Sequence, residues 1–183
     1  MIEYVIEHNP DDRVIEKASQ ILKRGGLICA PTDTNWQVLA NPYQKEALEK
    51  LYLLKKENQS KHFSLLCSSI SMASDLAHIN DSAFKLLKKI TPGHYTFIFE
   101  ATKKISKVIK ATKTDKEVGI RFVPSILIEK LIAVHGEALI STNIAPHMVD
   151  HLGDEKVYSY MIEDKFSHLI QMVIDPGEVE FVG

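Results

Sequence analysis

The sequence has little cysteine, little glycine and proline, and no long apolar run, and each scarcity excludes a class of protein. Its 183 residues include two cysteines, too few for a disulfide-stapled secreted scaffold. Eight glycines and seven prolines exclude collagen-like and low-complexity chains. No apolar run reaches the roughly 18 to 20 residues that a membrane-spanning helix requires. The remaining composition is that of an ordinary globular protein, so we expect one domain over residues 1–183.

The net charge and the N-terminal segment indicate the cellular compartment and limit the expected partners. The formal net charge of -2 argues against a chain that is basic throughout, although it allows a local basic face. The opening residues MIEYVIEHN contain two glutamates and no basic segment, so no secretory signal is expected. Cys29 and Cys67 lie in apolar runs, which favours buried free thiols in a reducing compartment. We therefore expect a cytoplasmic protein with no membrane partner.

Motifs of several familiar sites are also missing. The chain has no G-x-x-x-x-G-K-[ST] phosphate loop, no G-x-G-x-x-G and no G-x-S-x-G nucleophile elbow. His147 and His151 are four residues apart, but Pro146 and Gly153 disfavour a helix there and no third ligand is evident. We expect no tightly bound metal, and we expect the other histidines to be surface or capping residues.

Apolar patterns along the chain alternate between those of strands and those of helices. They predict eight strands, over 2–7, 27–30, 36–40, 63–67, 95–99, 118–123, 139–142 and 169–174. They predict helices over about 10–24, 44–54, 71–77, 81–89, 125–135 and 161–166, with a further basic and potentially helical stretch over 103–113. Asn9 is predicted to cap the first helix, with Pro10 as its first residue. This order predicts a mixed α/β (α+β) fold in which helices flank a twisted sheet.

Polar residues lie at the ends of two of the predicted strands. Pro31 removes a backbone donor, so the apolar strand before it should stop there. Thr32, Asp33 and Thr34 then lie at a strand end, where α/β folds place their ligands. Ser141-Thr142-Asn143 follow another apolar run, and they suit either a polar ligand or an ordinary strand end.

Lysines gather in two segments, and each has two interpretations. The segment 55–62, KKENQSKH, is either a solvated loop or an anion site in which lysines neutralise phosphate charge. The segment 103–116 is either a solvated basic stretch or part of a face that binds nucleic acid.

Five blocks together resemble the YrdC-like domain family. They read LICAPTDTNWQVLANP (27–42), LYLLKKENQSKHFSLL (51–66), TPGHYTFIF (91–99), VGIRFVP (118–124) and ALISTN (138–143). Their order and spacing are those of the family over about residues 15–145, and T-P-G-x-Y-T-F is shared with its YciO-like branch. The family includes threonylcarbamoyl-AMP synthases, which condense threonine, bicarbonate and ATP to begin threonylcarbamoyladenosine modification of tRNA. The resemblance implies a single YrdC-like domain with a cleft at the strand ends, shorter than the family by one last strand.

The resemblance also implies which residues bind ligands. Substrate binding is assigned to Thr32, Thr34 and Thr142. Binding of nucleotide phosphates is assigned to Lys55, Lys61, Arg121, Ser141 and Asn143. A face for double-stranded RNA or tRNA is assigned to Lys56, Lys103, Lys104, Lys107 and Lys110. The implied cofactors are ATP and Mg²⁺.

The chain departs from the family pattern where charge matters. Glu57 stands in place of the arginine of K-x-R-P-x-x-K-P-L, and Ala145 in place of the last asparagine of S-T-S-A-N. Gln37 and Leu39 replace the two glycines of T-V-Y-G-L-G. Arginine to glutamate changes the local charge by two units, each worth on the order of 4 kcal/mol at about 4 Å and an effective dielectric near 20. We therefore expect ATP to bind poorly in the usual pose of the family.

Three hypotheses about function follow from these departures. The first is a domain that binds nucleotide or RNA but has lost efficient threonylcarbamoyl-AMP synthesis. The second is an active synthase, or a related enzyme that forms another acyl-adenylate from ATP. The third is a vestigial pocket in a protein that acts through a partner. The loss of the charged residues favours the first.

Overall fold

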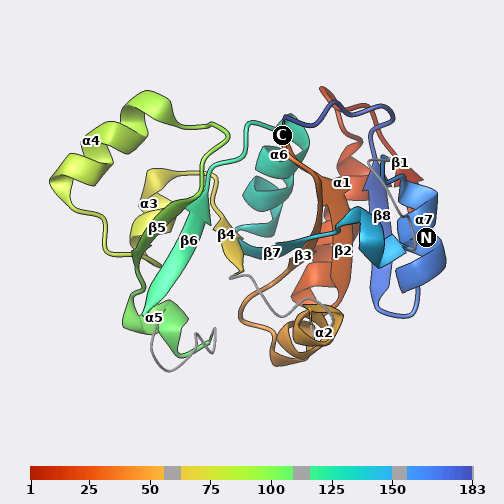
Figure 1. Ribbon diagram of the computed structural model, residues 1–183, viewed down its shortest axis with the longest axis horizontal. Helices are drawn as coiled ribbons and strands as arrows, with labels where there is room; N and C mark the ends of the chain where they lie inside the picture. Colours follow the sequence, from red (N-terminus) through yellow and green to blue (C-terminus); the bar gives the residue numbers. More distant parts are fainter. Residues whose placement is uncertain (56–62, 109–115, 150–155, 183) are drawn as a thin grey trace.

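The structure is a computed structural model that describes residues 1–55, 63–108, 116–149 and 156–182 (Figure 1). An eight-stranded mixed sheet crosses the molecule in the order β1-β8-β2-β3-β7-β4-β6-β5. Its strands are β1 (Ile2–Tyr4), β2 (Leu27–Pro31), β3 (Trp36–Ala40), β4 (Ser64–Leu66), β5 (Phe97–Glu100), β6 (Glu117–Arg121), β7 (Leu139–Asn143) and β8 (Ile170–Asp175). The mixed α/β class and the eight predicted strands are confirmed.

Helices pack on both faces of this sheet. They are α1 (Asp12–Lys23), α2 (Lys45–Lys55), α3 (Ile70–Ser74), α4 (Asp81–Ile90), α5 (Lys103–Ser106), α6 (Ile126–His135) and α7 (Ser159–Phe166), with a 3₁₀ turn η1 (Pro146–Val149). Strand β8 is parallel to both β1 and β2, and β4 is parallel to β6. The pairs β2–β3, β3–β7, β4–β7 and β5–β6 are antiparallel.

Both faces of β2 are buried, which explains why its sequence is a continuous apolar run. Leu27 and Cys29 enter the core that α2 and α7 cover, whereas Ile28 and Ala30 enter the core beneath α1 and α6. Both cysteines are free and buried, and burial raises the pKa of the Cys67 thiol to about 12. Neither thiol is therefore set up as a nucleophile.

The first helix begins later than the sequence predicts. Its N-cap is Asp11, whose carboxylate accepts a hydrogen bond from the Arg13 backbone N–H at 2.8 Å. The prediction of Asn9 as the cap and Pro10 as the first residue was wrong. A carboxylate satisfies an unpaired N–H of the first turn and also suits the positive end of the helix, so Asp11 takes this position.

A buried histidine joins three elements on the α1/α6 side. The Nδ1 atom of His135 lies 3.4 Å from the Ser19 hydroxyl, and Asn41 Nδ2 lies 3.2 Å from its Nε2 atom. Because the Asn41 amide N–H can only donate, Nε2 accepts and the ring is neutral, with its proton on Nδ1. Asn41 also donates to the Glu137 carboxylate at 3.1 Å.

This histidine should make the protein less stable in mild acid. Burial lowers the pKa of His135 below its usual value, the Glu137 carboxylate opposes that shift, and Lys23 adds to it. The unfolded chain therefore takes up this proton at a higher pH than the folded chain does. The contribution of His135 to the stability of the fold is fully present above the pKa of the unfolded chain. It is lost as the pH falls through 6.5 toward the lower pKa of the folded chain. Urea unfolding midpoints measured from neutral to acid pH should fall more steeply in the wild type than in His135→Gln, and equal slopes would contradict this assignment.

Candidate functional site

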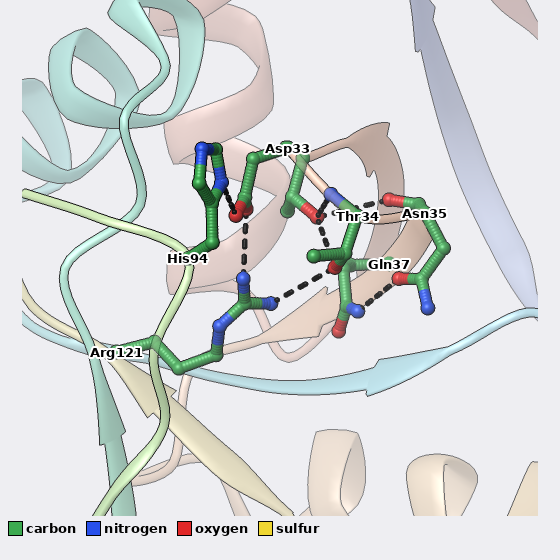
Figure 2. A network of polar contacts seen from close by, with 7 residues as sticks. Asp33, Thr34, Asn35, Gln37, His94 and Arg121 are labelled. Carbon is green, nitrogen blue, oxygen red and sulfur yellow. Dashed lines mark hydrogen bonds and ion pairs between the residues drawn. The ribbon is translucent and has the colours of Figure 1, made fainter. Parts of the chain in front are cut away.

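The segment between β2 and β3 forms a tight polar turn at the end of the sheet (Figure 2). Pro31, paired with Trp36, is the last residue of β2, so the predicted stop at this proline is confirmed. The Thr32 backbone N–H donates to the Asn35 carbonyl at 2.9 Å, and the Thr32 hydroxyl donates to the same carbonyl at 3.0 Å. The hydroxyl of Thr34 lies 3.5 Å from that of Thr32. The turn therefore holds both predicted threonines side by side.

A buried ion pair anchors this turn to the far part of the sheet. Arg121, the last residue of β6, donates from Nη2 to Oδ1 of Asp33 at 2.7 Å and from Nη1 to the Thr34 hydroxyl at 3.3 Å. The side chains of Arg121 and Asp33 are 7% and 3% exposed. The Nε atom of Arg121 is buried and has no hydrogen-bond partner in the described part of the chain. The guanidinium is thus largely committed to Asp33 inside the protein.

His94 completes the cluster from the loop between α4 and β5. Its Nδ1 atom lies 2.7 Å from Oδ2 of Asp33, so both oxygens of that carboxylate are engaged (Figure 2). The ring is 49% exposed. The sequence predicted a surface or capping residue here, and the ring is exposed, but its contact with the buried Asp33 carboxylate was not predicted. The available signal was its position in the T-P-G-H-Y-T-F block, directly before a predicted strand.

The Ser141-Thr142-Asn143 motif lies within a strand and not after one. All three residues belong to β7, which pairs with β3 on one side and with β4 on the other. The Ser141 hydroxyl donates to the Ser64 carbonyl at 3.3 Å. Successive residues of a strand face opposite sides, so Thr142 points away from the face that Ser141 and Asn143 share. The strand predicted over 139–142 is therefore confirmed and runs one residue further, because pairing on both sides carries β7 as far as Asn143. The motif forms the strand end that was one of its two interpretations.

Arg121 lies on the same face of the sheet as two of the other predicted phosphate ligands. The register pairs Arg121 with Leu66 and Leu66 with Leu139, and Leu139 shares a face of β7 with Ser141 and Asn143. On the neighbouring strand, Gln37 pairs with Asn143, and its amide donates to the Asn35 side chain. Gln37 is buried, so its side chain fills space at a position where the family has glycine.

The predicted lysines are divided between two parts of the chain. Lys55 is the last residue of α2, whereas Lys56, Lys61 and Lys110 lie outside the described residues, as does Glu57. Lys103 and Lys104 lie in α5, and Lys107 is its C-cap. Helix α5 follows the end of β5 that pairs with the start of β6, while Arg121 is the last residue of β6. The structure therefore places the α5 lysines and Arg121 at opposite ends of one strand.

A small cavity adjoins the turn and is bordered by His94. Its volume is 190 Å³, and its walls come from the end of β2, the start of α6 and the C-terminal segment. The lining residues are Glu7, Pro31, Thr32, Asp33, His94, Pro124, Ser125, Leu127, Pro176, Val179, Glu180 and Val182. Val182 also donates its backbone N–H to the Asp33 carbonyl at 2.8 Å, which holds the C-terminal segment over the turn.

Two structural findings concern metals and membranes. Within the described residues, no three histidine, cysteine, aspartate or glutamate side chains come together in a way that could hold a metal ion. His151, one of the two histidines considered above, lies outside those residues. No helix in the described parts of the chain is both long enough and apolar enough to cross a membrane.

A mixed eight-stranded sheet with a P-T-D-T turn bound to a strand-end arginine defines a domain of the YrdC-like class. The Sua5/YciO/YrdC family model, whose description is "Telomere recombination", matches residues 20–181, and the chain belongs to this family. YciO of Escherichia coli K12 is 30% identical over 141 residues, which are 77% of this chain and 68% of that protein. A putative threonylcarbamoyl-AMP synthase of Methanocaldococcus jannaschii is 26% identical over 166 residues, covering 87% of this chain and 78% of the other.

Solved structures agree with this assignment. The crystal structure of E. coli YciO matches 98% of this chain and 85% of its own, with a TM-score of 0.85 and 26% identity. Sua5 of P. abyssi, crystallised with L-threonine, matches 98% of this chain with a TM-score of 0.81. The match covers 51% of that Sua5 chain at 22% identity, so it shows the shared fold. The resemblance to the YrdC-like family and its YciO-like branch is confirmed, and the family is related to threonylcarbamoyl-AMP synthases.

Proposed function

We propose that this protein binds a small amino acid of the threonine class, binds an adenine nucleotide only weakly, and has lost efficient synthesis of threonylcarbamoyl-AMP. The support for an amino acid ligand is the retained turn, in which Thr32 and Thr34 lie together. The Sua5 relative of the same fold was crystallised with L-threonine. The relatives that are named threonylcarbamoyl-AMP synthases support a nucleotide as the second ligand.

The ion pair between Asp33 and Arg121 is the main support for weak nucleotide binding and lost synthesis. A triphosphate needs several cations, and the guanidinium of Arg121 is already neutralised by a buried carboxylate at 2.7 Å. None of the described residues that line the adjoining cavity is a lysine or an arginine. Glu57 in place of the family arginine weakens phosphate binding further. Mg²⁺ would arrive with the nucleotide, held by phosphate oxygens, because that ion is usually bound through few protein ligands.

Binding of double-stranded RNA or tRNA stays a prediction within this proposal. The observation in its favour is that Lys103, Lys104 and Lys107 lie on one short segment around α5. Phosphate contacts from lysines give RNA affinity that falls steeply with salt.

Ligand-dependent thermal stability tests the proposal directly. L-threonine should raise the melting temperature of the wild type in a saturable way, because a ligand that prefers the folded state stabilises it. ATP with Mg²⁺ at the same concentration should raise it much less, and Thr34→Val, which replaces the hydroxyl with a methyl group of similar size, should weaken the threonine effect. Short duplex RNA at low and high salt forms a separate arm of the same experiment.

A pyrophosphate assay separates this proposal from the active-synthase alternative. We expect no release of pyrophosphate that depends on both threonine and bicarbonate. Steady release that is abolished when either compound is omitted would establish the synthase and overturn the loss of activity proposed here. A flat thermal response to L-threonine would overturn the amino acid ligand.

A further inference from the structure

We propose that Nε2 of His94, a ring positioned by Asp33, accepts a hydrogen bond from the ammonium group of a small ligand bound in the cavity beside β2. This inference rests on the proposed function, since it requires a ligand that carries an amine. His94 lines the 190 Å³ cavity together with Thr32 and Asp33. The cavity has room for a small molecule and not for a whole nucleotide.

The surroundings of Asp33 fix where the proton of a neutral His94 ring lies. Oδ1 of Asp33 accepts from Arg121 at 2.7 Å, and an arginine side chain is charged at all ordinary pH values. A carboxylate held by a permanent cation acts as an acceptor toward its second partner as well. His94 therefore donates from Nδ1 to Oδ2 at 2.7 Å. In the neutral ring Nε2 then carries a lone pair and no proton, which is the arrangement of a base oriented by a carboxylate.

The second nitrogen of this histidine is available to a ligand. In the described part of the chain, the one polar contact of the ring is that from Nδ1 to Asp33. The ring is half-exposed, whereas the carboxylate that orients it is buried. Figure 2 shows the ring extending beyond Asp33, on the side away from Thr34. A rigid buried acceptor thus holds a base whose free nitrogen can reach solvent or a bound molecule.

The charge of the cavity walls selects an ammonium group as the ligand. Glu7 and Glu180 both line the cavity, and neither lysine nor arginine lines it among the described residues. The carboxylate of Asp33 is already neutralised by Arg121, so Glu7 and Glu180 supply the uncompensated charge. A cationic nitrogen is attracted to such a site, and a phosphate is repelled from it.

The proton stays on the ligand in this contact. An ammonium group is a weaker acid than an imidazolium, and the charges of Glu7 and Glu180 stabilise it further. The neutral ring therefore acts as a hydrogen-bond acceptor, and no N–H bond is broken.

Nitrogen NMR of protein labelled with ¹⁵N-histidine reads this contact directly. In the free wild type, the neutral His94 ring should show its proton on Nδ1 alone. Saturation with L-threonine should move the Nε2 signal to that of an acceptor nitrogen in a hydrogen bond, with the proton still on Nδ1, whereas (R)-3-hydroxybutanoate, which lacks the amine, should leave it unchanged. His94→Gln identifies the signal by its loss, and calorimetry should show at least threefold weaker threonine binding to that variant. Asp33→Asn should lose the preference for the proton on Nδ1.

The outcomes separate this inference from the proposed function. If calorimetry detects no binding of L-threonine to the wild type, the proposed function fails, and the role of His94 fails with it. If L-threonine binds and the Nε2 signal does not move, the inference alone is overturned. A free-protein spectrum with the proton on Nε2 would also overturn it. His94 is half-exposed, so His94→Gln should fold, and circular dichroism checks that both variants retain the wild-type fold.

Discussion

Replacement of Arg121 by methionine should lower the free energy of unfolding by about 3–5 kcal/mol. The substitution keeps most of the apolar stem but removes the cation that faces Asp33, whose side chain is 3% exposed. Among the described residues, the carboxylate would then keep His94 alone as a polar side-chain partner in the interior. Urea denaturation followed by circular dichroism measures this loss.

A matched double variant tests whether the missing charge is the cause. Asp33→Asn together with Arg121→Met removes both charges, so the pair should be clearly more stable than Arg121→Met alone. Replacing both members of a buried ion pair is often close to neutral, whereas removing one partner is not. A loss below about 1 kcal/mol in the single variant would show that water reaches Asp33 and that the pair is not buried in solution.

Replacement of Trp36 by alanine should have a similar effect, about 3–5 kcal/mol of lost stability. The side chain is 4% exposed and packs in the core covered by α2 and α7. Its indole N–H donates to the Val157 carbonyl at 2.8 Å, which ties the start of β3 to the segment before α7. The alanine variant therefore loses a large buried apolar surface and the hydrogen bond together.

Trp36→Phe is the matched control for this prediction. It retains an aromatic ring and loses chiefly the hydrogen bond, so a cost of about 1–2 kcal/mol is expected. Trp36 is the one tryptophan of the chain, so unfolding must be followed by circular dichroism and not by tryptophan fluorescence. Equal losses in the two variants would mean that the hydrogen bond, and not the packing, dominates at this position.

The elements of this fold are predictable from local patterns, whereas their ends and neighbours are not. Runs such as Leu27-Ile28-Cys29-Ala30 identify strands because both faces of the sheet are buried, and Pro31 marks where one of them stops. The helix start was misplaced because Asn9 and Asp11 are both good caps, and local sequence does not decide between them. The extension of β7 to Asn143 depends on strands β3 and β4, which pair with it from distant parts of the chain.

The same limit applies to the candidate site. The A-P-T-D-T segment identifies the turn and its threonines from sequence alone, and the family resemblance identifies Arg121. The ion pair between Arg121 and Asp33 joins residues far apart in the chain, so no local sequence pattern predicts it. His94 comes to the same carboxylate from a third segment, and this convergence depends on the order of the strands in the sheet.

The position of β8 has a consequence for how the chain folds as it is synthesised. Strand β8 separates β1 from β2, and Ile2 takes Val173 as its partner. While the ribosome is still translating the first 169 residues, β1 has no neighbour in the sheet, and one edge of β2 is uncovered. Closing so long a loop is slow, so sheet completion waits for the last strand. Until then the nascent chain presents an open apolar edge of the kind that chaperones protect.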